Sequence, residues 1–203
     1  MTSPVPDTTD APALHAERLL YVATGGIQAM FVPMWLYWLR SRYPDLELRY
    51  VMTPAAMRFT TQTALSVAAG PAEGMIDRWP DQPESALHVE LASWPDAVIV
   101  HPATMDFVSR LAHGAGGSPA MLALQCTTAP IVISPGLPPN GHLNAAYRKN
   151  VLELSERDNL VVVPPTMGTS MSSGEEGIGT PAYLPTALAA LAELRDWMTL
   201  THG

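Results

Sequence analysis

Residues 88–107 read HVELASWPDAVIVHPATMDF and combine a short helical turn, a strand and a polar turn. Ala97 to His101 is an apolar run of strand length, so we predict a buried strand there. Pro102 to Asp106 then forms the loop at its carboxyl end. In open α/β sheets this edge is where ligands bind. His88 places an ionisable imidazole just before the same unit, which makes residues 88–107 the first candidate for a functional site.

Strands and helices alternate over the rest of the chain. We predict further strands over 18–24, 47–52, 129–134 and 160–163, and helices over 27–42, 54–63, 107–113, 119–126, 143–157 and 185–199. Residues 66–86 are rich in Gly, Pro and Asp and are expected to be irregular. The alternation favours parallel βαβ units in a single-domain, doubly wound α/β sheet of the Rossmann-like, or flavodoxin-like, kind.

The composition excludes several classes of partner. The chain has 203 residues with 11 Lys and Arg against 19 Asp and Glu, a formal charge of -8 without a basic run. Nucleic acid and anionic membranes are therefore poor partners. Residues 1–16 are acidic and rich in Pro and Thr with no signal-peptide apolar region, so we expect a disordered tail, a domain over 17–203 and a cytoplasmic protein.

Cysteine and histidine usage argues against a metal or disulfide site. The single Cys126 has no internal disulfide partner, and its apolar helical context predicts a buried small hydrophobe. The six histidines lack the spacings of metal ligands, so no metal site is expected.

Two Gly-rich segments are candidates for ligand binding. Thr24, Gly25 and Gly26 follow the first strand, where glycines let the backbone approach a ligand and helix amides face an anion. With Thr53 after the second strand they suggest a phosphate site without Lys, although a plain tight turn fits the same residues. Residues 164–182 carry four glycines and are expected to form a mobile loop, since long loops in compact domains are often functional.

The order of these parts resembles the homo-oligomeric flavin-containing cysteine decarboxylases. This family includes phosphopantothenoylcysteine decarboxylase and the lanthipeptide and linaridin-type peptidyl-cysteine decarboxylases. His88, Leu91, Trp94 and Asp96 match its His-x-x-Leu-x-x-Trp-x-Asp segment, and residues 102–107 match its Pro-Ala-Ser-Ala-Asn-Thr loop. The resemblance spans about residues 19–163.

The resemblance implies a flavin site and a catalytic base. The cofactor is expected to be FMN, with FAD as the alternative, and His88 takes the place of the family's active-site base. The flavin phosphate is expected at the turn that matches Gly-Ser-Ile-Ala, and an aromatic residue near the isoalloxazine. The implied flavin-binding residues are Thr24, Gly25, Gly26, Ile27, Thr53, Phe59, Pro102, Ala103 and Thr104.

The implied substrate site departs from the family at two positions. Asp106 stands where relatives have an Asn that contacts the substrate carboxylate, and Pro138 replaces the Asn of Pro-Ala-Met-Asn. An ionised Asp repels a carboxylate, which counts against a phosphopantothenoylcysteine decarboxylase. Asn140 is the candidate for the missing amide, and Met171 and Gly174 belong to the expected substrate clamp over 164–182.

We therefore expect flavin-dependent oxidative decarboxylation of the C-terminal Cys of a ribosomally made precursor peptide, giving an aminoenethiol. The resemblance also implies a trimer or a dodecamer with flavin sites between subunits. A phosphopantothenoylcysteine decarboxylase-like enzyme, a flavin prenyltransferase and a non-catalytic flavin-binding homologue are the alternatives. A prenyltransferase needs a basic cluster that is absent here. His88 favours catalysis, whereas Asp106 and Pro138 favour the non-catalytic homologue.

Overall fold

A six-stranded parallel sheet forms the centre of the computed structural model, which describes residues 11–82, 85–171 and 174–202. The strand order is β3-β2-β1-β4-β5-β6, so the chain reverses its direction across the sheet between β1 and β4. This is the doubly wound α/β fold that the sequence predicts. The strands are β1 Arg18–Ala23, β2 Glu47–Met52, β3 Glu73–Ile76, β4 Ala97–Ala103, β5 Ile131–Pro135 and β6 Leu160–Val162.

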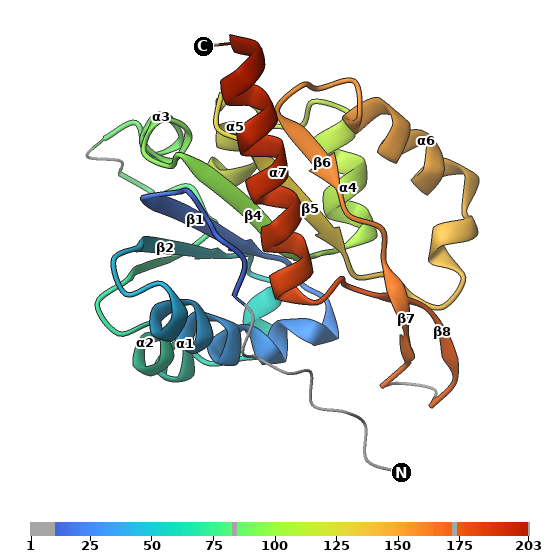
Figure 1. The fold of residues 1–203 in the computed structure, drawn as a ribbon. Helices are drawn as coiled ribbons and strands as arrows, with labels where there is room; N and C mark the ends of the chain where they lie inside the picture. Colours follow the sequence, from blue (N-terminus) through green and yellow to red (C-terminus); the bar gives the residue numbers. More distant parts are fainter. Residues whose placement is uncertain (1–10, 83–84, 172–173, 203) are drawn as a thin grey trace.

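Helices cover both faces of the sheet (Figure 1). One face is packed by α1, α2 and α7, and the other by α3, α4, α5 and α6. Three short 3-10 turns, η1, η2 and η3, complete the set. Their bounds are η1 Ile27–Phe31, α1 Val32–Arg42, η2 Ala56–Arg58, α2 Gln62–Ala69, α3 Leu87–Ser93, α4 Met105–Ala112, α5 Pro119–Cys126, η3 Gly141–Leu143, α6 Ala145–Leu154 and α7 Leu184–His202.

Alternate side chains of each central strand belong to different cores. In β1, Leu19 and Tyr21 pack with α1 and α7, whereas Leu20 and Val22 pack with the helices of the other face. All four side chains are fully buried. Burial on both faces explains why these strands read as continuous apolar runs rather than as alternating patterns.

The prediction that residues 66–86 are irregular was wrong in part. Glu73–Ile76 forms β3, an edge strand that pairs in parallel with β2. Gly74 makes this strand hard to predict, because glycine has a low propensity for strands. Glycine is nevertheless required there, because a Cβ would overlap the ring of Tyr50. The helix expected over 54–63 is the short turn η2, and α2 starts later, at Gln62, capped by the hydroxyl of Thr61, which accepts from the amide of Ala64.

Residues 164–182 contain a two-stranded antiparallel hairpin rather than a single loop. Its strands are β7 Thr166–Thr169 and β8 Glu176–Thr180, and it projects from the end of the sheet opposite α3 (Figure 1). Gly168 permits close pairing, because a Cβ there would overlap the side chain of Thr180. The hairpin is marginal on its own, so its attachment to the domain matters.

The structure also differs from two local predictions, the burial of Cys126 and the disorder of residues 1–16. Cys126 is exposed rather than buried, because it is the last residue of α5 and lies off the face that this helix buries. Of the expected tail, residues 1–10 lie outside the described residues, but Leu14 and Ala16 pack against the core and the hydroxyl of Tyr43 donates to the carbonyl of Pro12 at 2.8 Å. Within the described ranges, no helix has the length and apolar character needed to cross a membrane.

Candidate active site

A cleft of about 390 Å³ lies where the carboxyl ends of β1 and β4 meet. The switch of strand order occurs between these two strands, which is where open α/β sheets bind ligands. Four segments form its walls: the turn after β1, the start of α4, the segment after β5 and the β7–β8 hairpin. They contribute Gly25–Gln28, Thr104–Asp106, Gly136–Pro139 and hairpin residues between Gly168 and Thr180.

Thr24 joins the two central strands beneath this cleft. Its amide and its hydroxyl both donate to the carbonyl of Pro102, at 3.0 and 2.9 Å. The same hydroxyl oxygen accepts from the amide of Thr104 at 2.7 Å. A hydroxyl has one proton to donate, so the donor of the buried Thr24 is occupied. Thr24 therefore shapes the site, and Thr104 is held where it lines the cleft.

The Gly25-Gly26 turn brings backbone close to the cleft without intervening side chains. A Cβ on Gly25 would overlap that of Ala55, so the turn packs directly on the segment after β2. Gly26 precedes η1 without any side-chain cap. The amide of Gly26 donates to the carbonyl of Thr24 at 2.8 Å, so the amides at the start of η1, from Ile27 on, are the ones without an intrahelical partner, and such amides suit a phosphate group. The residues present thus fit the phosphate of a flavin mononucleotide.

Four other expected flavin residues do not belong to the lining of the cleft: Thr53, Phe59, and the buried Pro102 and Ala103 at the end of β4. Thr53 follows β2, and its hydroxyl accepts from the amide of Ala56 at 3.2 Å. Its own amide donates to Ala23 at 2.9 Å, which places it next to the end of β1. Phe59 follows η2 and is 38% exposed.

The expected substrate residues divide in the same way. Asp106 and Met171 line the cleft, and the carboxylate of Asp106 is solvent-exposed and 4.0 Å from the guanidinium of Arg110. Asn140 has a left-handed backbone, with φ 64°, and precedes η3. Neither Asn140 nor Gly174 belongs to the cleft lining.

His88 is not brought to the cleft of its own chain. It lies near the start of α3, which Figure 1 shows at the opposite end of the molecule from the hairpin. Its ring meets the edge of Trp79 at a centroid distance of 5.5 Å. Its Nδ1 is buried and has no hydrogen-bond partner among the described residues. An imidazole of this kind still has a polar atom to satisfy.

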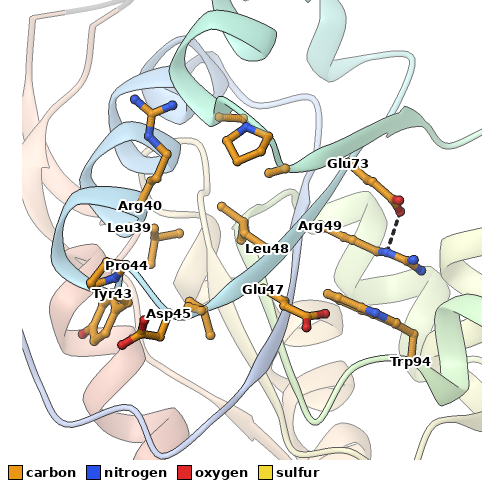
Figure 2. A pocket seen from close by; sticks show the side chains of 14 residues that line it. Leu39, Arg40, Tyr43, Pro44, Asp45, Glu47, Leu48, Arg49, Glu73 and Trp94 are labelled. Atoms are coloured by element: carbon orange, nitrogen blue, oxygen red, sulfur yellow. Dashed lines mark ion pairs between the residues drawn. The ribbon is translucent and has the colours of Figure 1, made fainter.

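Trp94 and Asp96, which share a motif with His88, have structural contacts. Arg49 lies 4.3 Å above the ring of Trp94 and pairs with Glu73 at 2.7 Å and Glu90 at 2.9 Å. Arg49, Glu73 and Trp94 line a second hollow (Figure 2), which shares no lining residue with the cleft. Because the cation of Arg49 is already paired, we assign the cluster to structure.

Asp96 fixes the start of β4. Its two carboxylate oxygens accept from the amides of Glu17 and Arg18, at 3.0 and 3.1 Å, and it pairs with Arg195 of α7 at 3.3 Å.

Sequence reasoning assigned no site role to Gln28 or to His101, which is buried in β4 outside the lining of the cleft. Gln28 lines the cleft, and its Oε1 lies close to both Gly26 and Gly136, across the opening. His101 is 4% exposed, and its ring nitrogens contact the hydroxyl of Tyr21 at 3.0 Å and the carbonyl of Ala182 at 2.9 Å. Burial lowers the pKa of His101 to about 4, so the ring is neutral.

Comparisons with known proteins agree with this architecture. The family model described as Flavoprotein matches residues 9–193. A cypemycin cysteine dehydrogenase (decarboxylating) from a Streptomyces species is 37% identical over 177 residues, which cover 85% of this chain and 88% of that protein. The coenzyme A biosynthesis bifunctional protein CoaBC of Haemophilus influenzae is 31% identical over 87% of this chain, but the match spans only 44% of that longer protein.

Solved structures show the same similarity. The crystal structure of the cypemycin decarboxylase CypD has a TM-score of 0.74 at 33% identity and covers 93% of this chain and 98% of its own. The FMN-dependent cysteine decarboxylase SpaF has a TM-score of 0.74 at 26% identity and covers 88% of this chain and 97% of its own.

Proposed function

The chain belongs to the flavoprotein family, and we propose that it is an FMN-dependent enzyme that oxidatively decarboxylates the C-terminal cysteine of a ribosomally made peptide. The product would be a peptide that ends in an aminoenethiol. The β7–β8 hairpin, which forms one wall of the cleft, is the observation that favours a peptide as the substrate. It offers an extended, Gly-rich surface, and residues 166–180 hold no Lys or Arg for a phosphorylated metabolite.

The residues around the Gly25-Gly26 turn would hold the cofactor. The amide of Ile27, with the neighbouring Thr53, is assigned to the FMN phosphate, while Gly26 contributes the close approach of the turn, since its own amide donates to the carbonyl of Thr24 at 2.8 Å. Phe59 and the segment Pro102 to Thr104 are assigned to its ring. In the family's Gly-Ser-Ile-Ala turn a Ser stands at the position of Gly26. The side chain of Gln28, which reaches from this turn toward Gly136, would supply the hydrogen bond of that Ser. Bound FMN supplies the oxidising equivalent for the cysteine side chain.

The remaining chemistry is a proton transfer, which we assign to His88. A neutral imidazole takes a proton from a thiol or an amide near neutral pH. Since His88 does not line the cleft of its own chain, it would serve the cleft of an adjacent subunit. The exposed side chains of Met30, Phe31 and Met34 give a surface for that assembly.

Mass spectrometry of peptides incubated with the purified protein tests the proposal. A peptide ending in Cys should lose carbon dioxide and two hydrogens, and the matched peptide ending in Ser should stay unchanged. The protein should be yellow, with an oxidised flavin spectrum. Turnover of phosphopantothenoylcysteine but of no peptide would contradict the assigned substrate. A colourless protein that binds no added FMN would contradict the assigned site.

A further inference from the structure

We propose that His101 is a positioning residue that ties the cofactor side of the cleft to the root of the β7–β8 hairpin. The root is defined here as Pro181 and Ala182, between β8 and α7. The inference rests on the proposed function, because it assigns the hairpin to peptide binding. It adds a residue that controls how firmly the hairpin is held.

The hydrogen bonds of His101 fix its tautomer. The carbonyl of Ala182 accepts only, so the Nε2 atom at 2.9 Å must carry the proton. Nδ1 is then bare and accepts from the hydroxyl of Tyr21 at 3.0 Å. One neutral tautomer thus satisfies both ring nitrogens. Burial agrees with this form, since it lowers the pKa of His101.

Aromatic rings hold the imidazole in this orientation. Tyr21 and Trp35 meet it edge-on, with centroid distances of 6.2 and 6.1 Å. Trp35 in turn meets Tyr183, the residue after Ala182, at 5.0 Å. The ring therefore bridges β1, α1 and the start of α7, and it cannot turn without displacing these neighbours.

The bridge connects two walls of the cleft. On one side, the residue after His101 is Pro102, whose carbonyl accepts both bonds from Thr24. On the other side, Ala182 follows closely after Thr180, the last residue of β8. A second bond near the root, from the amide of Leu137 to the carbonyl of Gly179 at 2.8 Å, shares the attachment. The His101 bond thus ties the root of the hairpin directly to β4.

Two substitutions at position 101 distinguish the effect of losing the hydrogen bond to Ala182 from the effect of changing the side-chain volume. His101→Gln places an amide donor near the position of Nε2, whereas the shorter His101→Asn reaches only the position of Nδ1. For His101→Asn we expect hydrogen exchange of the β8 amides and the KM for a Cys-ending peptide each to rise about tenfold. FMN affinity and kcat should change less than about twofold, and His101→Gln should restore both altered values.

Tyr21→Phe is the matched control. It removes the donor to Nδ1 and leaves the bond to Ala182, so hairpin exchange should stay as in the wild type even if overall stability falls. Nitrogen-15 NMR of the wild-type imidazole requires no variant and should show the Nε2–H tautomer at neutral pH. An Nδ1–H tautomer would overturn the proposal whatever the variants do.

Other outcomes are equally decisive. Unchanged β8 exchange in His101→Asn, or equal losses in the Asn and Gln variants together with release of FMN, would mean that His101 serves the general fold and not the hairpin. If the wild type turns over no Cys-ending peptide, the proposed function fails. The exchange comparison still decides the role of His101 in that case.

Discussion

Asp106 stands, according to the family resemblance, where relatives have an Asn. Its carboxylate lies in the cleft, exposed to solvent, and its nearest cation, Arg110, is 4.0 Å away on the same helix. Exposed pairs of this kind contribute little, so Arg110 does little to offset the carboxylate of Asp106, which under the proposed function would face the substrate. The C-terminal carboxylate of a bound peptide would enter the same cleft.

Asp106→Asn should therefore tighten the binding of a Cys-ending peptide, by a factor on the order of five or less for charges near water. The dissociation constant measured by calorimetry checks this. A peptide with an amidated C-terminus is the control, because it carries no carboxylate to repel, and its affinity should not change. Loss of turnover in Asp106→Asn with FMN still bound would contradict the repulsion argument and give Asp106 a positive role.

His101 should make the protein sensitive to acid. Its pKa falls from 6.5 to about 4 on folding because burial penalises the cation. Between these pH values the unfolded chain binds a proton that the folded chain does not, so the free energy of unfolding falls as pH drops through this window. The full loss from this one group is about 3 kcal/mol. Tyr21, which faces the ring, stays neutral because burial raises its pKa.

Urea unfolding at several pH values between 4 and 6.5 measures this slope. His101→Gln removes the titrating group and should flatten the curve relative to the wild type. A variant curve parallel to that of the wild type would show that other groups cause the acid sensitivity.

At the scale of elements, the sequence predicts most strands because they are buried on both faces. Continuous apolar runs mark β1, β4 and β5, and they have little other interpretation in a 203-residue chain. The edge strand β3 escapes prediction, since its pairing depends on Gly74 lying beneath Tyr50. The hairpin escapes for a similar reason, because its glycines suggest a loop until the facing strand is known.

The cleft was only partly predictable. The turn at Gly25 and the loop at Thr104 follow from their positions after apolar strands, together with the family resemblance. His101 was assigned only to the strand, because its partners Tyr21 and Ala182 lie 80 and 81 residues away in the sequence. Contacts at that separation exist only once the sheet and α7 have assembled.

The contact between the Gly25 turn and the segment after β2 gives a prediction about elements. Gly25→Ala would drive a Cβ into Ala55, so the two segments must separate. We expect a loss of about 1–3 kcal/mol in the free energy of unfolding and at least about tenfold weaker FMN binding. Thermal unfolding and flavin fluorescence measure these effects.

Gly116→Ala is the control for this substitution. Its new Cβ would come closest to the terminal Cδ1 of Leu122, at 3.1 Å, and neither residue lines the cleft. FMN binding should then equal that of the wild type. Wild-type FMN affinity in Gly25→Ala would contradict a cradle formed at this turn.

At the scale of the whole molecule, an apolar face is left uncovered along η1 and α1. The side chains of Met30, Phe31 and Met34 are 44%, 39% and 50% exposed, and Val67 of α2 is 73% exposed. Trp35 and Trp38 of α1, by contrast, are buried in the core of the chain itself. Neighbouring exposed apolar side chains of this kind are typical of a contact between subunits.

The family resemblance implies a trimer or a multiple of three, in which each active site would combine the cleft of one subunit with the imidazole of another. His88→Asn should keep FMN bound and lower kcat by roughly 10²-fold or more, the scale of a lost general base. Light scattering and steady-state kinetics measure the two quantities. A monomer that binds FMN tightly and turns over peptide would contradict both assembly and shared sites.

Mixed assemblies distinguish a shared site from a site within one chain. His88→Asn supplies intact clefts, and Gly25→Ala, if its cofactor binding is lost, supplies intact imidazoles. When the two inactive variants are unfolded together and reassembled, a shared site brings an intact cleft and an intact His88 into the same interface, so turnover should return to a fraction of the wild-type value. Each variant reassembled alone should stay inactive. If the mixture is also inactive although mass spectrometry shows mixed trimers, His88 acts within its own chain or not at all, and the uncovered α1 face has to be explained without a shared active site.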